Sequence, residues 1–524
     1  MEKVSMNKDV LVIGGQITGA GTAVRLADAG YNVIFAKQDG SADNPPDALF
    51  GVSAQALADW RKTTDQAASN NKIEVLDNTR LTRAAGVAGD YSVRLANGKG
   101  VAEKTVGAVV VTTDEVIQPL DGAYGVTLSD KVLTQTQLEE KVAAGAVKGM
   151  SVGFLSGFGG AASPLAMQRI FRSVLAILSD GGSASVYVND LKLADNCLDR
   201  LYKEGRDKGA VYFKMKECPA IEGTSLTFQD TVLGRQVTTE HDLLVIDEAL
   251  APNPLNLELA EVLGLHRTPS GFLQKDNVHR FPVNSNREGI FVVGPARHIK
   301  GLTDCVTDMD SVLPELKMLF ATEVLPTERI AVVDREKCAI CLTCYRCCPH
   351  GAIYWDDKAI ISPVACQGCG ICASECPQEA IQIEGFSDDD INARVKDALK
   401  KSPEGIIAFC CENSAVEAAR AAQTFGMDMP ETLQTIPVPC AGKVDINYIL
   451  TAFVEGASGV LVVACHDGNC KSEFGSNYAR WRAQEAARML EETGFDKNRL
   501  AFVTLAANMG ADFADAVNSM RMAS

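Results

Sequence analysis

The sequence is poor in positive charge and has no long apolar run. Its 524 residues include 50 Lys and Arg against 67 Asp and Glu, and no basic run offsets the resulting net charge of −17. A nucleic-acid surface needs a basic stripe, so we expect no nucleic-acid partner. No uninterrupted apolar stretch approaches the ~20 residues that a membrane-spanning helix needs, so we expect no direct membrane span.

Signals for secretion and for familiar catalytic machinery are also missing. The start, MEKVSMNK, is polar and leads directly into a strand, which predicts a cytoplasmic protein whose membrane association would come through partner subunits. We find no Ser-His-Asp order, no paired-carboxylate signature and no Gly-Lys-Ser/Thr phosphate loop. We therefore assign no catalytic residue.

Cysteine, in contrast, is abundant and clustered. Twelve of the 17 cysteines lie between residues 338 and 440. Disulfide frameworks belong to short secreted domains, whereas ordered clusters in a large chain of a reducing compartment indicate metal binding.

Two runs carry the strongest signal, CAICLTCYRCCP from Cys338 and CQGCGICASECP from Cys366. Each reads C-x2-C-x2-C-x3-C-P, and they start 28 residues apart, which indicates a duplicated unit of the bacterial two-cluster ferredoxin type. In this pattern the fourth cysteine serves the other cluster. We predict one [4Fe-4S] cluster on Cys338, Cys341, Cys344 and Cys376, and a second on Cys366, Cys369, Cys372 and Cys348.

A structural zinc site is the alternative for these cysteines. Zinc takes four ligands, usually in two C-x2-C pairs, which leaves the doubled pattern of eight unexplained. The surplus thiol is Cys347. So short a segment, predicted as residues 329–386, has little core of its own and should fold only with its clusters.

The stretch VLVIGGQITGAGTA, residues 10–23, has the strand, glycine turn and helix of a dinucleotide-binding domain. Gly14 and Gly19 fill the first and third glycine places, but Gln16 replaces the second, and Lys37 stands where an acid would hold a ribose. If a flavin is bound, its predicted contacts are Gly14, Gly15, Gly19 and Gly294. The alternative is that these glycines only permit close packing.

Further strand, turn and helix patterns predict an α/β, Rossmann-like fold with two dinucleotide domains in residues 1–328, of which 121–285 form the second. This region resembles the A-type subunit of heterodisulfide reductase and the flavoprotein-like subunits of quinone-interacting membrane-bound oxidoreductases. Stretches such as DTVLGRQVTTEHDLLVID and GFLQKDNVHRFPVNSNREGIFVVG carry the resemblance. It implies FAD, but the FAD-binding pattern is altered at four places, which are Gln16, Lys37, residues 111–113 and residues 247–249. Whether FAD is retained stays open.

After a predicted linker helix in residues 387–404, residues 405–524 alternate strands and helices, which predicts a small parallel α/β domain. Cys411, Cys440 and Cys465 follow or end strands, so they should converge at one sheet edge together with Cys470. The domain resembles the delta subunit of methyl-viologen-reducing hydrogenase, which implies a [2Fe-2S] cluster on these four cysteines, although Ser414 replaces a cysteine of that family. Four buried free cysteines are the alternative.

Three functions remain open on these grounds. The first is an electron-transfer subunit of a heterodisulfide-reductase-like or quinone-linked complex, a relay rather than a self-sufficient catalyst, with other redox subunits as partners, one of them anchored in a membrane. The second is an FAD-dependent subunit that splits or merges electron pairs. The third is a scaffold subunit with a degenerate flavin domain, in which only the ferredoxin segment carries electrons.

Overall fold

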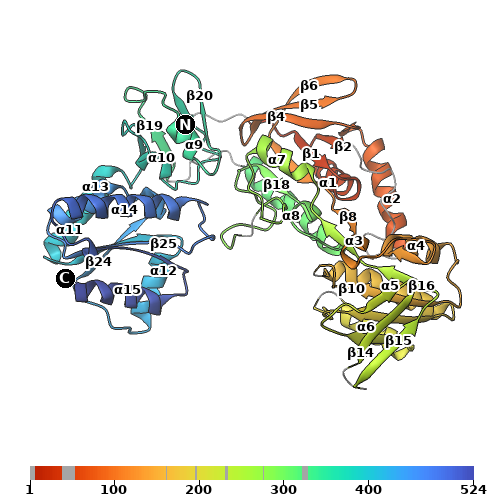
Figure 1. The fold of residues 1–524 in the computed structure, drawn as a ribbon. Coiled ribbons are helices and arrows are strands. Elements are labelled where there is room, and N and C mark those ends of the chain that lie inside the picture. The colour runs from red at the N-terminus through yellow and green to blue at the C-terminus, as the bar shows by residue number, and fades with distance from the viewer. Residues whose placement is uncertain are drawn as a thin grey trace.

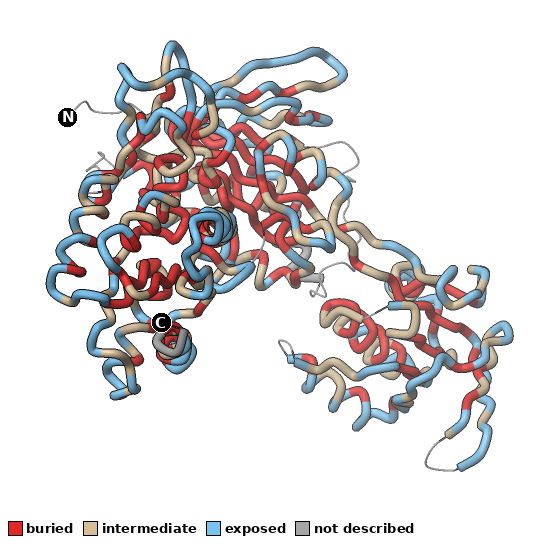
Figure 2. Tube along the Cα trace, turned by 60° about the vertical axis from the view of Figure 1, so that its left-hand side comes forward, coloured by how far each residue is buried: buried red, intermediate tan, exposed pale blue. Residues whose placement is uncertain are grey.

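The computed structural model describes residues 6–37, 54–160, 162–194, 197–230, 234–274, 277–321 and 329–523. Four units follow one another along the chain (Figure 1), and the buried residues run through the sheets of each of the three larger ones (Figure 2). None of the helices in these residues has the length and apolar character needed to cross a membrane.

The first unit is a parallel sheet of five strands in the order β18-β7-β1-β2-β3. Its centre is fully buried Val and Ile, as a sheet covered on both faces requires. The strands are β1 (Val10–Gly14), β2 (Val33–Lys37), β3 (Ile73–Leu76), β7 (Ala108–Thr112) and β18 (Ile290–Val292), and the helices are α1 (Gln16–Asp28), α2 (Ala54–Ser69), α7 (Leu255–Leu263) and α8 (Leu302–Ala321). An antiparallel sheet follows β3 and consists of β4 (Arg80–Val87), β5 (Asp90–Asn97) and β6 (Gly100–Val106).

The second unit repeats this plan with a parallel sheet in the order β12-β11-β10-β16-β9. Its strands are β9 (Val132–Thr134), β10 (Ser151–Ser156), β11 (Ser183–Val188), β12 (Val211–Lys214) and β16 (Leu243–Ile246), and its helices are α3 (Asp121–Tyr124), α4 (Gln135–Ala143), α5 (Pro164–Ser179) and α6 (Leu198–Asp207). An antiparallel sheet of β13 (Ala220–Glu222), β14 (Ser225–Asp230) and β15 (Arg235–Glu240) is added to it. The pair β8 (Val116–Pro119) and β17 (Glu248–Ala251) joins the two units.

The third unit is small and internally repeated. Each half has a short helix at its cysteine triplet, α9 (Thr343–Cys347) or α10 (Ile371–Ser374). The strands pair as β19 (Ala331–Val333) with β22 (Ile381–Ile383), and β20 (Ile353–Trp355) with β21 (Ala359–Ile361). Its apolar side chains join the cores of the neighbouring units, so the segment has no sizeable core of its own.

The fourth unit is a parallel sheet in the order β24-β23-β25-β26, with helices on both faces (Figure 1). Its strands are β23 (Ile406–Cys411), β24 (Leu433–Val438), β25 (Gly459–Cys465) and β26 (Leu500–Leu505), and its helices are α11 (Asp388–Lys401), α12 (Ala415–Thr424), α13 (Ile446–Val454), α14 (Gly475–Glu492) and α15 (Gly510–Ala523). The helix expected as a linker, α11, packs against α13 and β24 through Ile391, Val395 and Leu399. The fold class predicted from the sequence is thus the one observed.

Candidate metal and cofactor sites

The first cysteine set gathers side chains from both halves of the third unit. The pKa of the Cys344 thiol is raised by burial and further by the charges of Cys341, Cys376 and Cys338. Cys376 belongs to the second sequence motif, yet it lies with the first triplet. The fold therefore brings together the four residues that the sequence assigned to one cubane.

The second cysteine set likewise includes a thiol from the other half of the third unit. Burial raises the pKa of Cys372 well above its usual value, and the charges of Cys369, Cys348, Cys347 and Cys366 add to this effect. Cys348 comes from the first motif. Cys347, the surplus thiol, is buried beside both sets and donates a hydrogen bond to the Cys344 carbonyl at 3.4 Å.

The backbone around both triplets has the same unusual conformation. Residues on either side of the second cysteine have positive φ, 54° at Ile340 and 57° at Leu342 in the first half, and 61° at Gly368 and 82° at Gly370 in the second. Non-glycine residues with positive φ are uncommon and concentrate where function requires them. The first half therefore keeps a strained turn that the second half makes with glycine.

Backbone amides point at the sulfurs of both exchanged cysteines. Ala352 N–H donates to Cys348 Sγ at 3.4 Å, and Ala380 N–H donates to Cys376 Sγ at 3.3 Å. Each amide belongs to the fourth residue after its cysteine. Such hydrogen bonds stabilise charge on the sulfur and are one way in which a protein sets a cluster potential.

Cys411, Cys440, Cys465 and Cys470, here called the thiol ring, meet at the carboxyl end of the fourth sheet. The Cys411 and Cys465 sulfurs are hydrogen-bonded at 3.6 Å, and a Cβ atom on Gly475 would lie 2.4 Å from Cys440 Sγ and 3.3 Å from Cys470 Sγ. Interactions among the four thiols lower the pKa of Cys411 and Cys470 and raise the pKa of Cys440 and Cys465. The convergence predicted from the strand ends is therefore present, although the part of the chain that the structure describes forms no site for a single metal ion from three or more His, Cys, Asp or Glu.

The glycines at the first nucleotide turn lie in close contact with other residues of the chain. A Cβ atom on Gly14 would lie 2.5 Å from the Thr112 carbonyl carbon, and one on Gly19 would lie 2.6 Å from the Phe35 ring. Gly294, with φ 64°, faces Thr18 and Cys305. Packing alone therefore accounts for glycine at these three positions.

At Gly15, the space in front of the α1 amino terminus is taken by a carboxylate. A Cβ atom there would lie 1.7 Å from an Asp114 carboxylate oxygen. The neighbouring Glu115 is buried, and this burial, followed by the Asp114 charge, raises its pKa to about 8. In dinucleotide-binding domains the helix amino terminus receives the pyrophosphate, so acids at this position oppose the anionic ligand. The sequence prediction missed both acids, although they stand directly after the strand in VVVTTDE.

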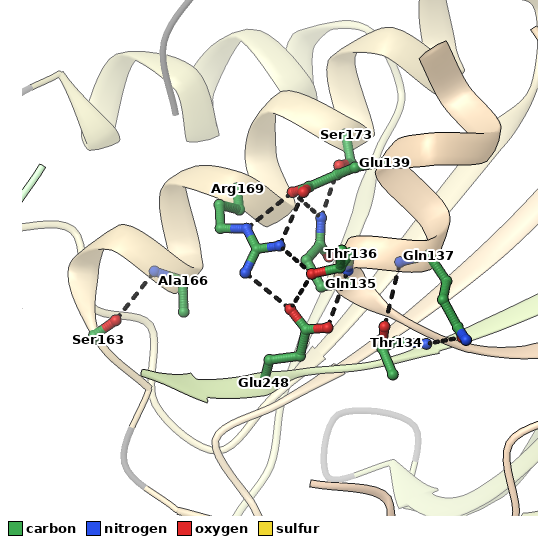
Figure 3. Close-up of polar contacts among 10 residues, drawn as sticks. All are labelled: Thr134, Gln135, Thr136, Gln137, Glu139, Ser163, Ala166, Arg169, Ser173 and Glu248. Carbon is green, nitrogen blue, oxygen red and sulfur yellow. Dashed lines mark hydrogen bonds and ion pairs between the residues drawn. The ribbon is translucent and has the colours of Figure 1, made fainter. Parts of the chain in front are cut away.

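At the second nucleotide turn, too, a carboxylate of the chain lies against the glycine turn. Asp247, after β16, accepts hydrogen bonds from Gly157 N–H at 2.8 Å and from the Tyr124 hydroxyl at 2.9 Å. Beside it Glu248 forms a buried ion pair with Arg169 at 2.9 Å, which Glu139 and Thr136 complete (Figure 3). Both turns thus hold a carboxylate of the chain itself.

Lys37 at the end of β2 pairs with Asp77 at 3.4 Å, so the ribose-binding acid is replaced by a cation with its own partner. Residue Asp39, the nearest acid in the sequence, lies outside the described residues. These contacts and the acids at both turns do not fit a bound FAD.

The fold and the gathered thiols define an iron–sulfur redox protein whose amino-terminal part is flavoprotein-like. A family model for the delta subunit of methyl-viologen-reducing hydrogenase matches residues 406–523, and one for a 4Fe-4S binding domain matches residues 359–382. The chain belongs to the former family through this domain, and over 64% of its length it is similar to the A-type subunit of heterodisulfide reductase.

Two curated relatives illustrate these similarities. The A-type subunit of the ferredoxin:CoB-CoM heterodisulfide reductase of Methanosarcina mazei is 25% identical over 345 residues, 64% of this chain and 44% of that protein. The vhu iron-sulfur D-type subunit of the F420-non-reducing hydrogenase of Methanocaldococcus jannaschii is 39% identical over 115 residues, 22% of this chain and 86% of that protein. The chain thus spans less than half the length of the first relative.

Among solved structures, thioredoxin reductase of Lactococcus lactis aligns with a TM-score of 0.41 at 15% identity, over 59% of this chain and 98% of that one. LpdA of Mycobacterium tuberculosis aligns with a TM-score of 0.42 at 16% identity, over 62% of this chain and 76% of that one.

Proposed function

We propose that the chain is an electron-transfer subunit of a multi-subunit, heterodisulfide-reductase-like complex and that it works without flavin. Cys338, Cys341, Cys344 and Cys376 would hold one [4Fe-4S] cluster and Cys348, Cys366, Cys369 and Cys372 the other. The thiol ring would hold a [2Fe-2S] cluster. When bound, such clusters accept and release single electrons.

One observation carries this proposal. Cys376 lies near the first triplet, and Cys348 and Cys347 lie near the second; this supports the proposal, because two cubanes that share one duplicated segment require one thiol to cross in each direction. A structural zinc site would need only four of these eight thiols. The residues contribute a fixed ligand geometry, amide donors to sulfur and a largely buried environment.

The partners are proposed from the relatives. Those relatives are subunits of heterodisulfide reductases and of hydrogenases, so a second redox subunit is the expected electron donor or acceptor. Membrane association would come through such a subunit. The flavin-dependent alternative is disfavoured because carboxylates lie against the glycine turns of both nucleotide-like domains.

Three serine variants test the cluster assignment in anaerobically purified protein. Cys344→Ser should lose about four irons, and Cys465→Ser about two, with loss of the matching EPR signal in the reduced protein. Cys218→Ser changes an exposed thiol outside all three sets and should keep every iron. An unchanged iron content in Cys344→Ser would refute the cubane assignment. If Cys344→Ser loses iron and Cys465→Ser keeps its full iron content, the result would favour the scaffold function.

A further inference from the structure

A segment of the third unit lies in direct contact with the chain that follows the thiol ring. One partner is residues 370–372, which include a predicted ligand of the second cubane set, and the other is the 3-10 turn Ala441–Lys443 directly after Cys440. A Cβ atom on Gly442 would lie 2.6 Å from Ile371 Cγ1. A residue without a side chain therefore lets the two segments approach closely, and the thiol ring lies beside the second cubane set.

Helix α14 extends one arginine into this contact. Arg482 is buried, with 8% of the residue exposed, although its side chain carries a full charge. Its Nη1 atom donates to the Gly442 carbonyl at 2.7 Å and to the Val444 carbonyl at 3.0 Å. Its Nη2 atom donates to the Glu375 carboxylate of the third unit at 2.5 Å. One guanidinium therefore holds the turn that follows the thiol ring and the cubane unit at the same time.

The ion pair between Arg482 and Glu375 is the stronger of two that join these units. Its side chains are 9% and 27% exposed, and a charge this buried is costly to leave unpaired. Among the described residues the other ion pair between the third and fourth units is that of Arg329 with Glu412, whose side chains are 51% and 30% exposed. Exposed pairs contribute little to stability. The link between the units therefore depends mainly on Arg482.

A planar guanidinium is suited to such a link. Its N–H donors form a fixed fork, so one nitrogen can bind the two carbonyls while the other binds the carboxylate. Hydrogen bonds to a charged partner are also stronger than those between neutral groups. Folded units of one chain move relative to each other unless their contact fixes them. Arg482 supplies a fixed contact at the place where two cluster sites meet.

We propose that Arg482 is a positioning residue that fixes the thiol ring beside the cubane unit, so that single electrons pass within the chain between the [2Fe-2S] cluster and the nearer [4Fe-4S] cluster. The inference rests on the proposed function. Each transfer moves one electron, so one cluster is oxidised as the other is reduced. Electron transfer and magnetic coupling between two clusters both weaken steeply as the clusters move apart. The three hydrogen bonds of Arg482 end on oxygen, so its loss should weaken the coupling and leave the iron in place.

The variants Arg482→Met and Glu375→Ala test the link from its two sides in the whole anaerobic protein. The readout is the microwave power that half-saturates the [2Fe-2S] EPR signal after full reduction with dithionite, because a reduced cubane nearby speeds the relaxation of that signal. Both variants should keep their iron and show a half-saturation power several-fold below that of the wild type. Glu375→Ala leaves the bonds of Arg482 to the Gly442 and Val444 carbonyls in place, so it isolates the contact between the units.

Arg480→Met is the matched control. Arg480 also lies on α14, but it pairs with Asp467 of the fourth unit at 2.6 Å, so its loss should leave the half-saturation power at the wild-type value. A wild-type value in Glu375→Ala with complete iron, or an equal decrease in Arg480→Met, would overturn the role of Arg482. Glu375→Ala decides the matter if Arg482→Met loses iron. A wild-type protein without a [2Fe-2S] signal would instead overturn the proposed function.

Discussion

The nucleotide-like units and the cysteine-rich units are both built on glycine turns and strand ends, but they differ in what those turns and ends hold. In the former, the parallel sheets are intact while Asp114 and Asp247 lie where a dinucleotide phosphate would bind. In the third unit, the two cysteine sets are gathered by short helices and two-stranded sheets alone. The difference teaches that a parallel sheet can stay folded without a bound ligand, whereas a small metal-binding segment should need its metal to fold.

The energetic reason lies in where each unit finds its core. The two nucleotide-like sheets bury continuous apolar strands and need no cofactor for cohesion. The third unit shares its apolar residues with its neighbours, so its stability should depend on iron.

Removal of iron should therefore have the largest effect on folding. The loss of structure should be confined to the third unit and should spare the nucleotide-like units. After acid or chelator treatment, residues 329–386 should lose amide protection completely, because small metal sites contribute folding energy outright. The β1 and β10 strands should keep theirs. Hydrogen exchange with mass spectrometry measures both, and full protection of residues 329–386 in the iron-free protein would contradict the comparison.

Arg169→Met should destabilise the second nucleotide-like unit without touching iron. Its guanidinium pairs with Glu139 and Glu248 in a buried network, so its removal leaves two carboxylates uncompensated at a cost of about 3–5 kcal/mol. Chemical denaturation followed by a probe in that unit measures the loss. Arg172→Met changes an exposed residue on the same helix and should stay within about 0.5 kcal/mol of wild type.

Glu115→Gln should remove a pH dependence from the first unit. The folded pKa, about 8, lies above the unfolded value near 4.5, so the folded state holds this proton across that window and loses stability as pH rises. The slope should approach about 1.4 kcal/mol per pH unit between these values. Denaturation at several pH values should give a flatter profile for Glu115→Gln, and identical profiles would show that Glu115 is not the buried acid described here.

Cys347→Ser should have the smallest effect and sharpens the ligand assignment. Cys347 is adjacent to Cys348 and lies beside both sets, and its thiol donates a hydrogen bond to the Cys344 carbonyl. The variant should keep full iron content and both cubane signals, with a stability loss of about 1 kcal/mol for a polar substitution at a buried site. Loss of about four irons would mean that Cys347 is a ligand in place of its neighbour.

The sequence predicted the parallel sheets because buried apolar runs such as VLVI and GVLVVAC mark strands. The C-x2-C-x2-C-x3-C-P spacing likewise predicts which cysteine crosses to the other half, and that ligand assignment stays a prediction. The antiparallel sheets β4–β6 and β13–β15 were not predicted, because β4, β6 and β15 are largely exposed, and β5 and β14 alternate more buried with less buried residues and so have no apolar run. Tertiary contacts such as Asp114 at Gly15 and Glu473 at His266 join residues far apart in the chain, so no local pattern reveals them.

The most direct test of the account is the ratio of iron to flavin in anaerobically purified protein. We predict about ten irons per chain, from two cubanes and one [2Fe-2S] cluster, with no stoichiometric flavin. Zinc in place of iron, or one FAD per chain, would contradict it.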